Sequence, residues 1–151
     1  MTKIIDRLLN AKILIIDDNR GDIMLTRLAF KRSGLAVDIV TADTAEEGLR
    51  ILRQEGEYVG QRRPDLVLCD LNLPLMNGLE FLRAVKVDAA LRRIPVLIMS
   101  SSSLDKDVGD CYDQFASGYM TKPYTKDGYD DLVERVECYW FSLVHCPENK
   151  A

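Results

Sequence analysis

The chain has 151 residues, 47% of them hydrophobic and 29% charged, which is typical of one globular domain with a single core. Its formal net charge of −4 argues against a nucleic-acid partner, which would require a basic face. The sequence contains no signal peptide and no apolar run of about eighteen residues, so we expect a cytoplasmic protein with no membrane partner. The four cysteines lack C-x-x-C spacing and only one histidine is present, which leaves little basis for zinc or histidine chemistry.

Short apolar runs alternate along the chain with segments of helical spacing. The runs predict five strands, in chain order 12–16, 37–41, 66–69, 96–99 and 118–121. The helical spacing and the stop signals predict five helices, at about 20–33, 45–56, 78–88, 108–115 and 126–146. The fourth helix is expected to bury a stripe of Val108, Cys111, Tyr112 and Phe115. Such alternation predicts an α/β protein with a parallel sheet covered on both faces.

Capping residues mark several of the predicted helix ends. Asn19 is suited to the N-cap of the first helix, with Asp22 in its first turn and Gly34 as its stop. Thr44 and Glu47 have the spacing of a capping box. We find no linker and no internal repeat, so we interpret 1–151 as a single domain with a core of about 11–145 and no effector domain.

Polar residues follow four of the predicted strands. Their identities, in strand order, are Asp17 and Asp18, then Asp70, then Ser100, then Lys122. Taken singly, each has an ordinary explanation as a turn residue, a helix cap or a solvated side chain. However, the carboxyl ends of parallel strands meet at one edge of the sheet, where α/β proteins bind ligands. The shared position therefore predicts one site that contains three acids, a hydroxyl and a lysine.

Three carboxylates at one place repel one another unless a cation binds. Because the ligands are oxygens, we expect a hard cation, Mg²⁺ with Mn²⁺ as the alternative. An aspartate can also act as a nucleophile and form an aspartyl phosphate. The predicted chemistry is in-line phosphoryl transfer to Asp70, with Lys122 and Ser100 each holding a phosphoryl oxygen.

These residues together resemble a response-regulator receiver domain. The match rests on Asp17-Asp18, on Asp70 to Pro74 with Gly78, on Ser100 after 95–99, on Tyr119 and on Lys122-Pro123. The resemblance implies a flavodoxin-like, doubly wound sheet of five strands in the order 2-1-3-4-5, with five helices. It implies that Asp70 is the phosphoacceptor and that Ser100 and Lys122 bind the phosphoryl group. Asp18 and Asp70 would bind Mg²⁺ directly, Asp17 through water, and Asn72 through its backbone carbonyl.

The resemblance also implies how the domain switches. Ser100 and Tyr119 would move together on phosphorylation, and the bond before Pro123 is the candidate for a cis peptide. An alternative for Tyr119 is simple packing on the last helix. Two departures from the family pattern stand out. Phe115 stands where receivers often have glycine, which indicates a reshaped turn, and Ser100 replaces the commoner threonine.

Segments 52–58 and 138–141 are similar to the small receivers that pair with bacterial phytochrome histidine kinases. This likeness implies a red-light-linked sensor histidine kinase as phosphodonor and a homodimer formed through the last strand and helices. Three aromatic residues near the end are the interface candidates, namely Tyr139, Trp140 and Phe141. The expected role is a single-domain response regulator in a two-component phosphorelay, which signals through protein contacts.

Two other classes of protein use a similar fold or nucleophile. A phosphatase of the haloacid dehalogenase type also attacks with an aspartate at a strand end, but such enzymes have Asp-x-Asp, whereas here Asn72 replaces the second acid. A flavin-binding module would need a phosphate loop after the first strand, where Asp17 and Asp18 would repel a phosphate. We therefore expect a phosphoacceptor that assists its own phosphorylation, not an enzyme, with the phosphatase as the alternative.

Overall fold

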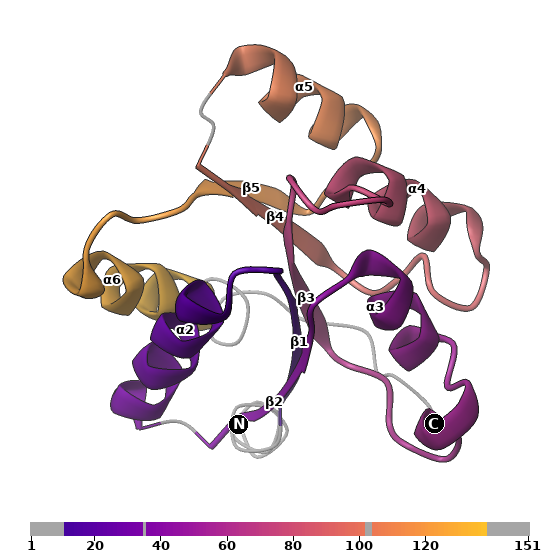
Figure 1. Cartoon of the computed structure of the whole chain (residues 1–151), viewed down its shortest axis with the longest axis horizontal. Helices are drawn as coiled ribbons and strands as arrows, with labels where there is room; N and C mark the ends of the chain where they lie inside the picture. The colour runs from indigo at the N-terminus through magenta and orange to yellow at the C-terminus, as the bar shows by residue number, and fades with distance from the viewer. Residues whose placement is uncertain (1–10, 35, 102–103, 139–151) are drawn as a thin grey trace.

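A parallel sheet of five strands forms the centre of the computed structural model, which describes residues 11–34, 36–101 and 104–138 (Figure 1). The strands are β1 (Lys12–Ile16), β2 (Asp38–Ala42), β3 (Leu66–Asp70), β4 (Val96–Ser100) and β5 (Gly118–Thr121). Their order is β2-β1-β3-β4-β5, and each neighbouring pair is parallel. The expected fold and strand order are confirmed.

Helices cover both faces of this sheet (Figure 1). They are α2 (Arg20–Ser33), α3 (Ala45–Leu52), the 3₁₀ helix η1 (Gly56–Tyr58), α4 (Gly78–Val87), α5 (Asp105–Asp113) and α6 (Lys126–Val136). Side chains of β1 alternate between the two cores: Leu14 and Ile16 face the helices α3, α4 and α5, while Ile13 and Ile15 face α2 and α6. This alternation of side chains, with both faces covered, explains why every residue of β1 is buried.

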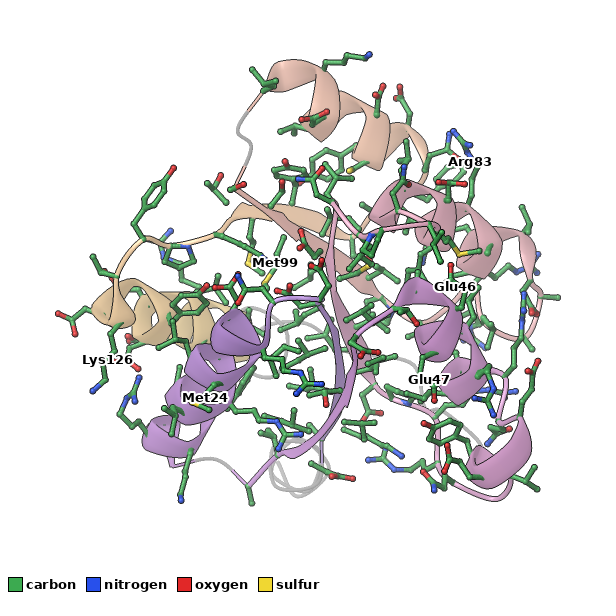
Figure 2. All side chains as sticks on the ribbon, viewed as in Figure 1. Met24, Glu46, Glu47, Arg83, Met99 and Lys126 are labelled. Atoms are coloured by element: carbon green, nitrogen blue, oxygen red, sulfur yellow. The ribbon has the colours of Figure 1, made fainter. Side chains whose placement is uncertain are left out.

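The helix ends follow the capping signals with one exception. The side chain of Asn19 accepts a hydrogen bond from the backbone of Asp22, and Gly34 ends α2 in the left-handed conformation. Thr44 caps α3 as expected, but the carboxylate of Glu47, in the first turn of α3 (Figure 2), binds Tyr58 and Arg50. The expected capping box at α3 is thus only half formed. A complete capping box is present at the start of α4, between Asn77 and Glu80.

Two expectations about the helices were wrong. The helix expected to reach residue 56 ends at Leu52, and η1 follows it. The expected stripe on the fourth helix fails because only Cys111 of its four members is buried, and Phe115 lies beyond the end of α5 with 74% of its surface exposed. Phe115 has a φ of 67°, a conformation that glycine adopts without strain. Phe115 therefore occupies a turn position whose backbone conformation favours glycine.

The last helix buries Tyr129, Leu132, Val133 and Val136 against residues of β1, β3, β4 and α2. The interface candidates Tyr139, Trp140 and Phe141 lie outside the described residues. No helix in the described ranges combines the length and the apolar character needed to cross a membrane.

Candidate functional site

The polar residues expected at the strand ends are brought together at one edge of the sheet. Asp17 follows β1, Asp70 ends β3, Ser100 ends β4 and Lys122 follows β5. Asp17, Asp70 and Ser100 are nearly inaccessible, with exposed fractions of 1%, 6% and 0%. Charged and polar groups are rarely buried without hydrogen-bond or ionic partners, so the partners of these three residues identify the site.

Lys122 is the centre of the arrangement. Its Nζ lies 2.8 Å from Asp17 Oδ2 and 3.2 Å from Asp70 Oδ2, although 105 and 52 residues of sequence separate the pairs. A third carboxylate oxygen, Asp22 Oδ2, lies 2.9 Å away. The backbone N–H of Lys122 donates to the carbonyl of Ser100 over 2.7 Å, which fixes the lysine against the end of β4. All three donors of the ammonium thus face carboxylates.

The loop after β3 holds the Asp70 carboxylate from the other side. The backbone N–H of Asn72 donates to Asp70 Oδ1 over 3.2 Å, and the side-chain amide of Asn72 lies 3.2 Å from Ser100 Oγ. Gly78 closes this loop, because its N–H donates to the carbonyl of Leu71. A Cβ at Gly78 would lie 2.4 Å from the Asp70 carbonyl oxygen, so only glycine permits this close approach.

Burial and ion pairing have opposite effects on the site's charges. Burial raises the pKa of the Asp17 carboxyl, and hydrogen bonds from Lys122 and from the Asn19 backbone only partly offset this. For Lys122, burial alone would lower the pKa of the ammonium, but hydrogen bonds to Asp17 and Asp22 outweigh it and raise the pKa overall. The lysine is therefore charged at neutral pH, as binding of an anionic phosphoryl group requires.

The acids also fit the cation that the sequence predicted. One carboxylate oxygen each from Asp17, Asp18 and Asp70 lie within 4.8 Å of one another, and Asp18 is exposed while the other two are buried. An all-oxygen set with one open side suits Mg²⁺ or Mn²⁺, which keep several waters. The donor chemistry therefore fits the expected metal.

A groove of about 560 Å³ opens beside these acids. It lies between the loop after β3 and the side of α5, and its lining includes Asp18, Asn72, Leu73, Pro74, Asn77 and Asp107. Its polar end adjoins the acids, while leucine and proline side chains line the rest.

The two residues of the expected switch lie near each other on adjoining strands. Ser100 is buried at the end of β4, and Tyr119 of β5 pairs in register with Ile98 and packs, partly buried, against the core on the α3–α5 side. The expected cis bond before Pro123 is corrected, because the Lys122–Pro123 peptide is trans. Even before proline, trans is favoured by about 0.5–1 kcal/mol, so a Lys-Pro pair alone does not require cis.

Sequence reasoning missed the role of Asp22. We interpreted it only as an acid that suits the first turn of a helix, yet its carboxylate pairs with Lys122. No local spacing signals this pairing, because Asp22 and Lys122 are 100 residues apart in the sequence.

Comparisons with known proteins agree with this geometry. The model of the response regulator receiver domain matches residues 13–137. The response regulator Rcp1 of Synechocystis sp. is 31% identical over 135 residues, which are 89% of this chain and 92% of that protein. The methanogenesis regulatory protein FilR2 of Methanothrix harundinacea, whose role is described as probable, is 33% identical over 89% of this chain and 86% of its own length.

Two solved structures extend the likeness to three dimensions. The phosphorylated cyanobacterial phytochrome response regulator RcpA is 37% identical, with a TM-score of 0.87 over 92% of this chain and 99% of that chain. The Mn²⁺-bound form of Rcp1 is 30% identical, with a TM-score of 0.83 over 91% of this chain and 99% of that chain. Neither the family match nor these relatives support the phosphatase alternative. The chain belongs to the response regulator receiver family of two-component systems, and it is related to phytochrome response regulators.

Proposed function

We propose that this receiver accepts a phosphoryl group on Asp70 from a sensor histidine kinase and signals by a conformational switch and protein contacts. The observation that carries the proposal is the buried contact between the Asp70 carboxylate and the Lys122 ammonium, with Asp17 and Asp18 beside them. A carboxylate that is buried next to a fixed cation, at the end of a groove, is placed for attack on a phosphoryl group.

The step is a transfer between two nucleophiles. A carboxylate oxygen of Asp70 forms a bond to phosphorus while the bond from phosphorus to the donor's histidine nitrogen breaks, and the leaving nitrogen keeps that electron pair. Lys122 and Ser100 would each take a phosphoryl oxygen, because both lie within reach of Asp70. A Mg²⁺ or Mn²⁺ held by Asp17, Asp18, Asp70 and the Asn72 carbonyl would neutralise developing negative charge.

Ser100 and Tyr119 are the residues that would change conformation in response to the charge of the phosphoryl group. The Ser100 hydroxyl lies at the Asp70 end of β4 and Tyr119 lies on the neighbouring strand. If the hydroxyl turns to a phosphoryl oxygen, the space beside it becomes available to the ring of Tyr119. A change of this kind would shift the surface formed by α5 and β5 from one conformation to another, and a partner could bind the two conformations differently.

A phytochrome-type histidine kinase is the donor that the relatives support. RcpA is described as a phytochrome response regulator, and the likeness covers nearly all of both chains. A cytoplasmic homodimer, with Tyr139, Trp140 and Phe141 at its interface, is part of the same proposal, and sedimentation of the wild type and Trp140→Ala tests it. The protein would act as a phosphoacceptor that assists its own modification rather than as an enzyme.

Intact mass after incubation with acetyl phosphate tests the proposal. We expect one phosphoryl adduct on the wild type that requires Mg²⁺, and none on Asp70→Asn. Asp43→Asn is the matched control, because Asp43 follows β2 at the same edge of the sheet but is exposed. Equal adducts on the wild type and Asp70→Asn would contradict Asp70 as the acceptor. If acetyl phosphate gives no adduct, a phytochrome kinase with ATP is the second donor, and no adduct from either would overturn the proposal.

A further inference from the structure

Asp22 is the one partner of Lys122 that does not come from a strand end. It lies in the first turn of α2, and its Oδ2 is 2.9 Å from Lys122 Nζ, closer than the 3.2 Å of Asp70. Asp17 and Asp70, the other two partners, belong to the acid cluster that fits a metal, whereas Asp22 is outside it. Lys122 thus shares two of its three carboxylates with the candidate cation.

The position of Asp22 is itself fixed by several contacts. Its backbone N–H donates to Asn19 Oδ1 over 3.1 Å, and its carbonyl accepts from the hydroxyl of Thr26 over 2.9 Å. The charge of its carboxylate also acts on Tyr129, a residue of α6 that is 2% exposed. Burial and then the charge of Asp22 raise the pKa of Tyr129 to about 12, so its phenol remains a donor at neutral pH.

The side-chain contacts run from α2 to the residue proposed as phosphoacceptor: Asp22 to Lys122, and Lys122 to Asp70. Figure 1 shows α2 and α6 side by side on one face of the sheet, and the pair is further joined by the Arg32–Asp130 ion pair. These contacts therefore reach the site from the face opposite to α3, α4 and α5.

We propose that Asp22 is a positioning residue that keeps the Lys122 ammonium beside Asp70 when a metal binds the carboxylates of Asp17 and Asp70. This inference rests on the proposed function and deepens it. Without Asp22, the Lys122 ammonium keeps only Asp17 and Asp70 as carboxylate partners in the described part of the chain, and it competes with the cation for these two carboxylates. With Asp22 present, the lysine has a carboxylate that the metal does not use.

The competition can be measured without phosphorylation. Mn²⁺ binding, followed by the electron paramagnetic resonance signal of the free ion, is compared in the wild type, Asp22→Asn, Lys122→Met and the double variant. We expect Asp22→Asn to weaken Mn²⁺ binding about tenfold when Lys122 is present, and less than about twofold when Lys122 is methionine. Lys122→Met alone should tighten binding, because the competing ammonium is gone.

The design separates positioning from simple loss of charge. An effect of Asp22→Asn that is equal in both backgrounds would show that Asp22 acts only through its long-range charge, and it would overturn the inference, as would no effect in either. Asp43→Asn removes a charge from the same edge of the sheet and should leave Mn²⁺ binding within about twofold of the wild type. A tenfold loss in that control would also count against a specific role for Asp22.

Tyr129→Phe tests the same idea by a second route and keeps it testable if Asp22→Asn does not fold. The variant retains the buried ring and removes only the hydroxyl on which the charge of Asp22 acts. We expect Mn²⁺ binding about threefold weaker with Lys122 present and unchanged with methionine there. Wild-type protein that binds no Mn²⁺ would overturn both this inference and the proposed function. Wild-type protein that binds Mn²⁺ and is phosphorylated, with no coupling to Lys122 in either variant, would overturn this inference alone.

Discussion

The side-chain amide of Asn72 lies 3.2 Å from the hydroxyl of Ser100, so the loop after β3 is tied to the end of β4 directly beside Asp70. Ser100 is fully buried, and its hydroxyl is held at the place where a phosphoryl oxygen would bind. The contact means that one of the two proposed phosphoryl-binding side chains is already oriented by a neighbour before any donor arrives.

Removing the Ser100 hydroxyl should slow phosphorylation. We expect Ser100→Ala to lower the rate with acetyl phosphate about tenfold, because one hydrogen bond to the phosphoryl group is lost. Ser100→Thr keeps the hydroxyl and should stay within about threefold of the wild type, despite its added methyl group. The rates come from a time course of intact mass at fixed Mg²⁺. Equal phosphorylation rates for the alanine and threonine variants would show that the Ser100 hydroxyl does not bind the phosphoryl group.

Gly78 should tolerate no side chain, because it lies against the backbone that carries Asp70. A Cβ there would be 2.4 Å from the Asp70 carbonyl oxygen and 2.7 Å from Leu71 Cα. We expect Gly78→Ala to lower the free energy of unfolding in urea by about 3 kcal/mol. Gly109→Ala is the control, since a Cβ at Gly109 in α5 meets nothing within 4 Å.

The control should change stability in the opposite direction. Alanine is a better helix former than glycine, so Gly109→Ala should raise the free energy of unfolding by about 0.5–1 kcal/mol. Similar losses for both variants would contradict the close approach of Gly78 to the backbone of β3.

Phe115 should be replaceable by glycine with a gain in stability. Its φ of 67° is strained for a residue with a side chain, and 74% of its surface is exposed, so little packing is lost. We expect Phe115→Gly to raise the free energy of unfolding by about 1 kcal/mol. Tyr112→Gly makes the same kind of change three residues earlier, inside α5, and should lower the free energy of unfolding by about 1 kcal/mol. Urea titrations of the two variants measure these changes. A lower free energy of unfolding for Phe115→Gly than for the wild type would contradict backbone strain at Phe115.

The described thiols should differ sharply in reactivity. Burial, then the charges of Asp107 and Asp110, raises the pKa of Cys111 to about 11, and burial also raises the pKa of Cys69 well above its ordinary value. Because a raised pKa keeps a thiol neutral, and only the thiolate reacts, both should resist a disulfide reagent at pH 8. Cys138 is exposed and should react.

A Cys146→Ser background limits the assay to these three thiols. We expect one thiol to react in the native protein and three after unfolding, with the fast one lost in Cys138→Ser. Rapid reaction of two thiols in the native state would show that Cys69 or Cys111 is more accessible than the structure indicates.

Much of the fold could be predicted because the strands are contiguous apolar runs. Each predicted strand lies within one residue of the observed one. The three central strands, β1, β3 and β4, are buried along their whole length, so each is a nearly unbroken apolar run. Asp17, Asp70, Ser100 and Lys122 could be grouped for the same reason, because parallel strands deliver their ends to one edge.

Other features depend on packing that periodicity does not record. The pairing of Asp22 with Lys122 requires the position of α2 relative to β5, which no local pattern contains. Phe115 continued a helical spacing, yet the helix ends before it in a turn that its residue type does not favour. Glu47 had the spacing of a capping box, but Tyr58, eleven residues later, competes for its carboxylate.

The Asp17–Lys122 contact joins residues that are 105 positions apart. Neither a nascent chain nor a partly folded intermediate that lacks β5 can form it, because Asp17 follows β1 and Lys122 follows β5, with β3 and β4 between these strands in the sheet. The chain would therefore become able to accept a phosphoryl group only after all the strands from β1 to β5 have joined the sheet. A chain that has not completed its sheet would therefore not be phosphorylated and would not signal.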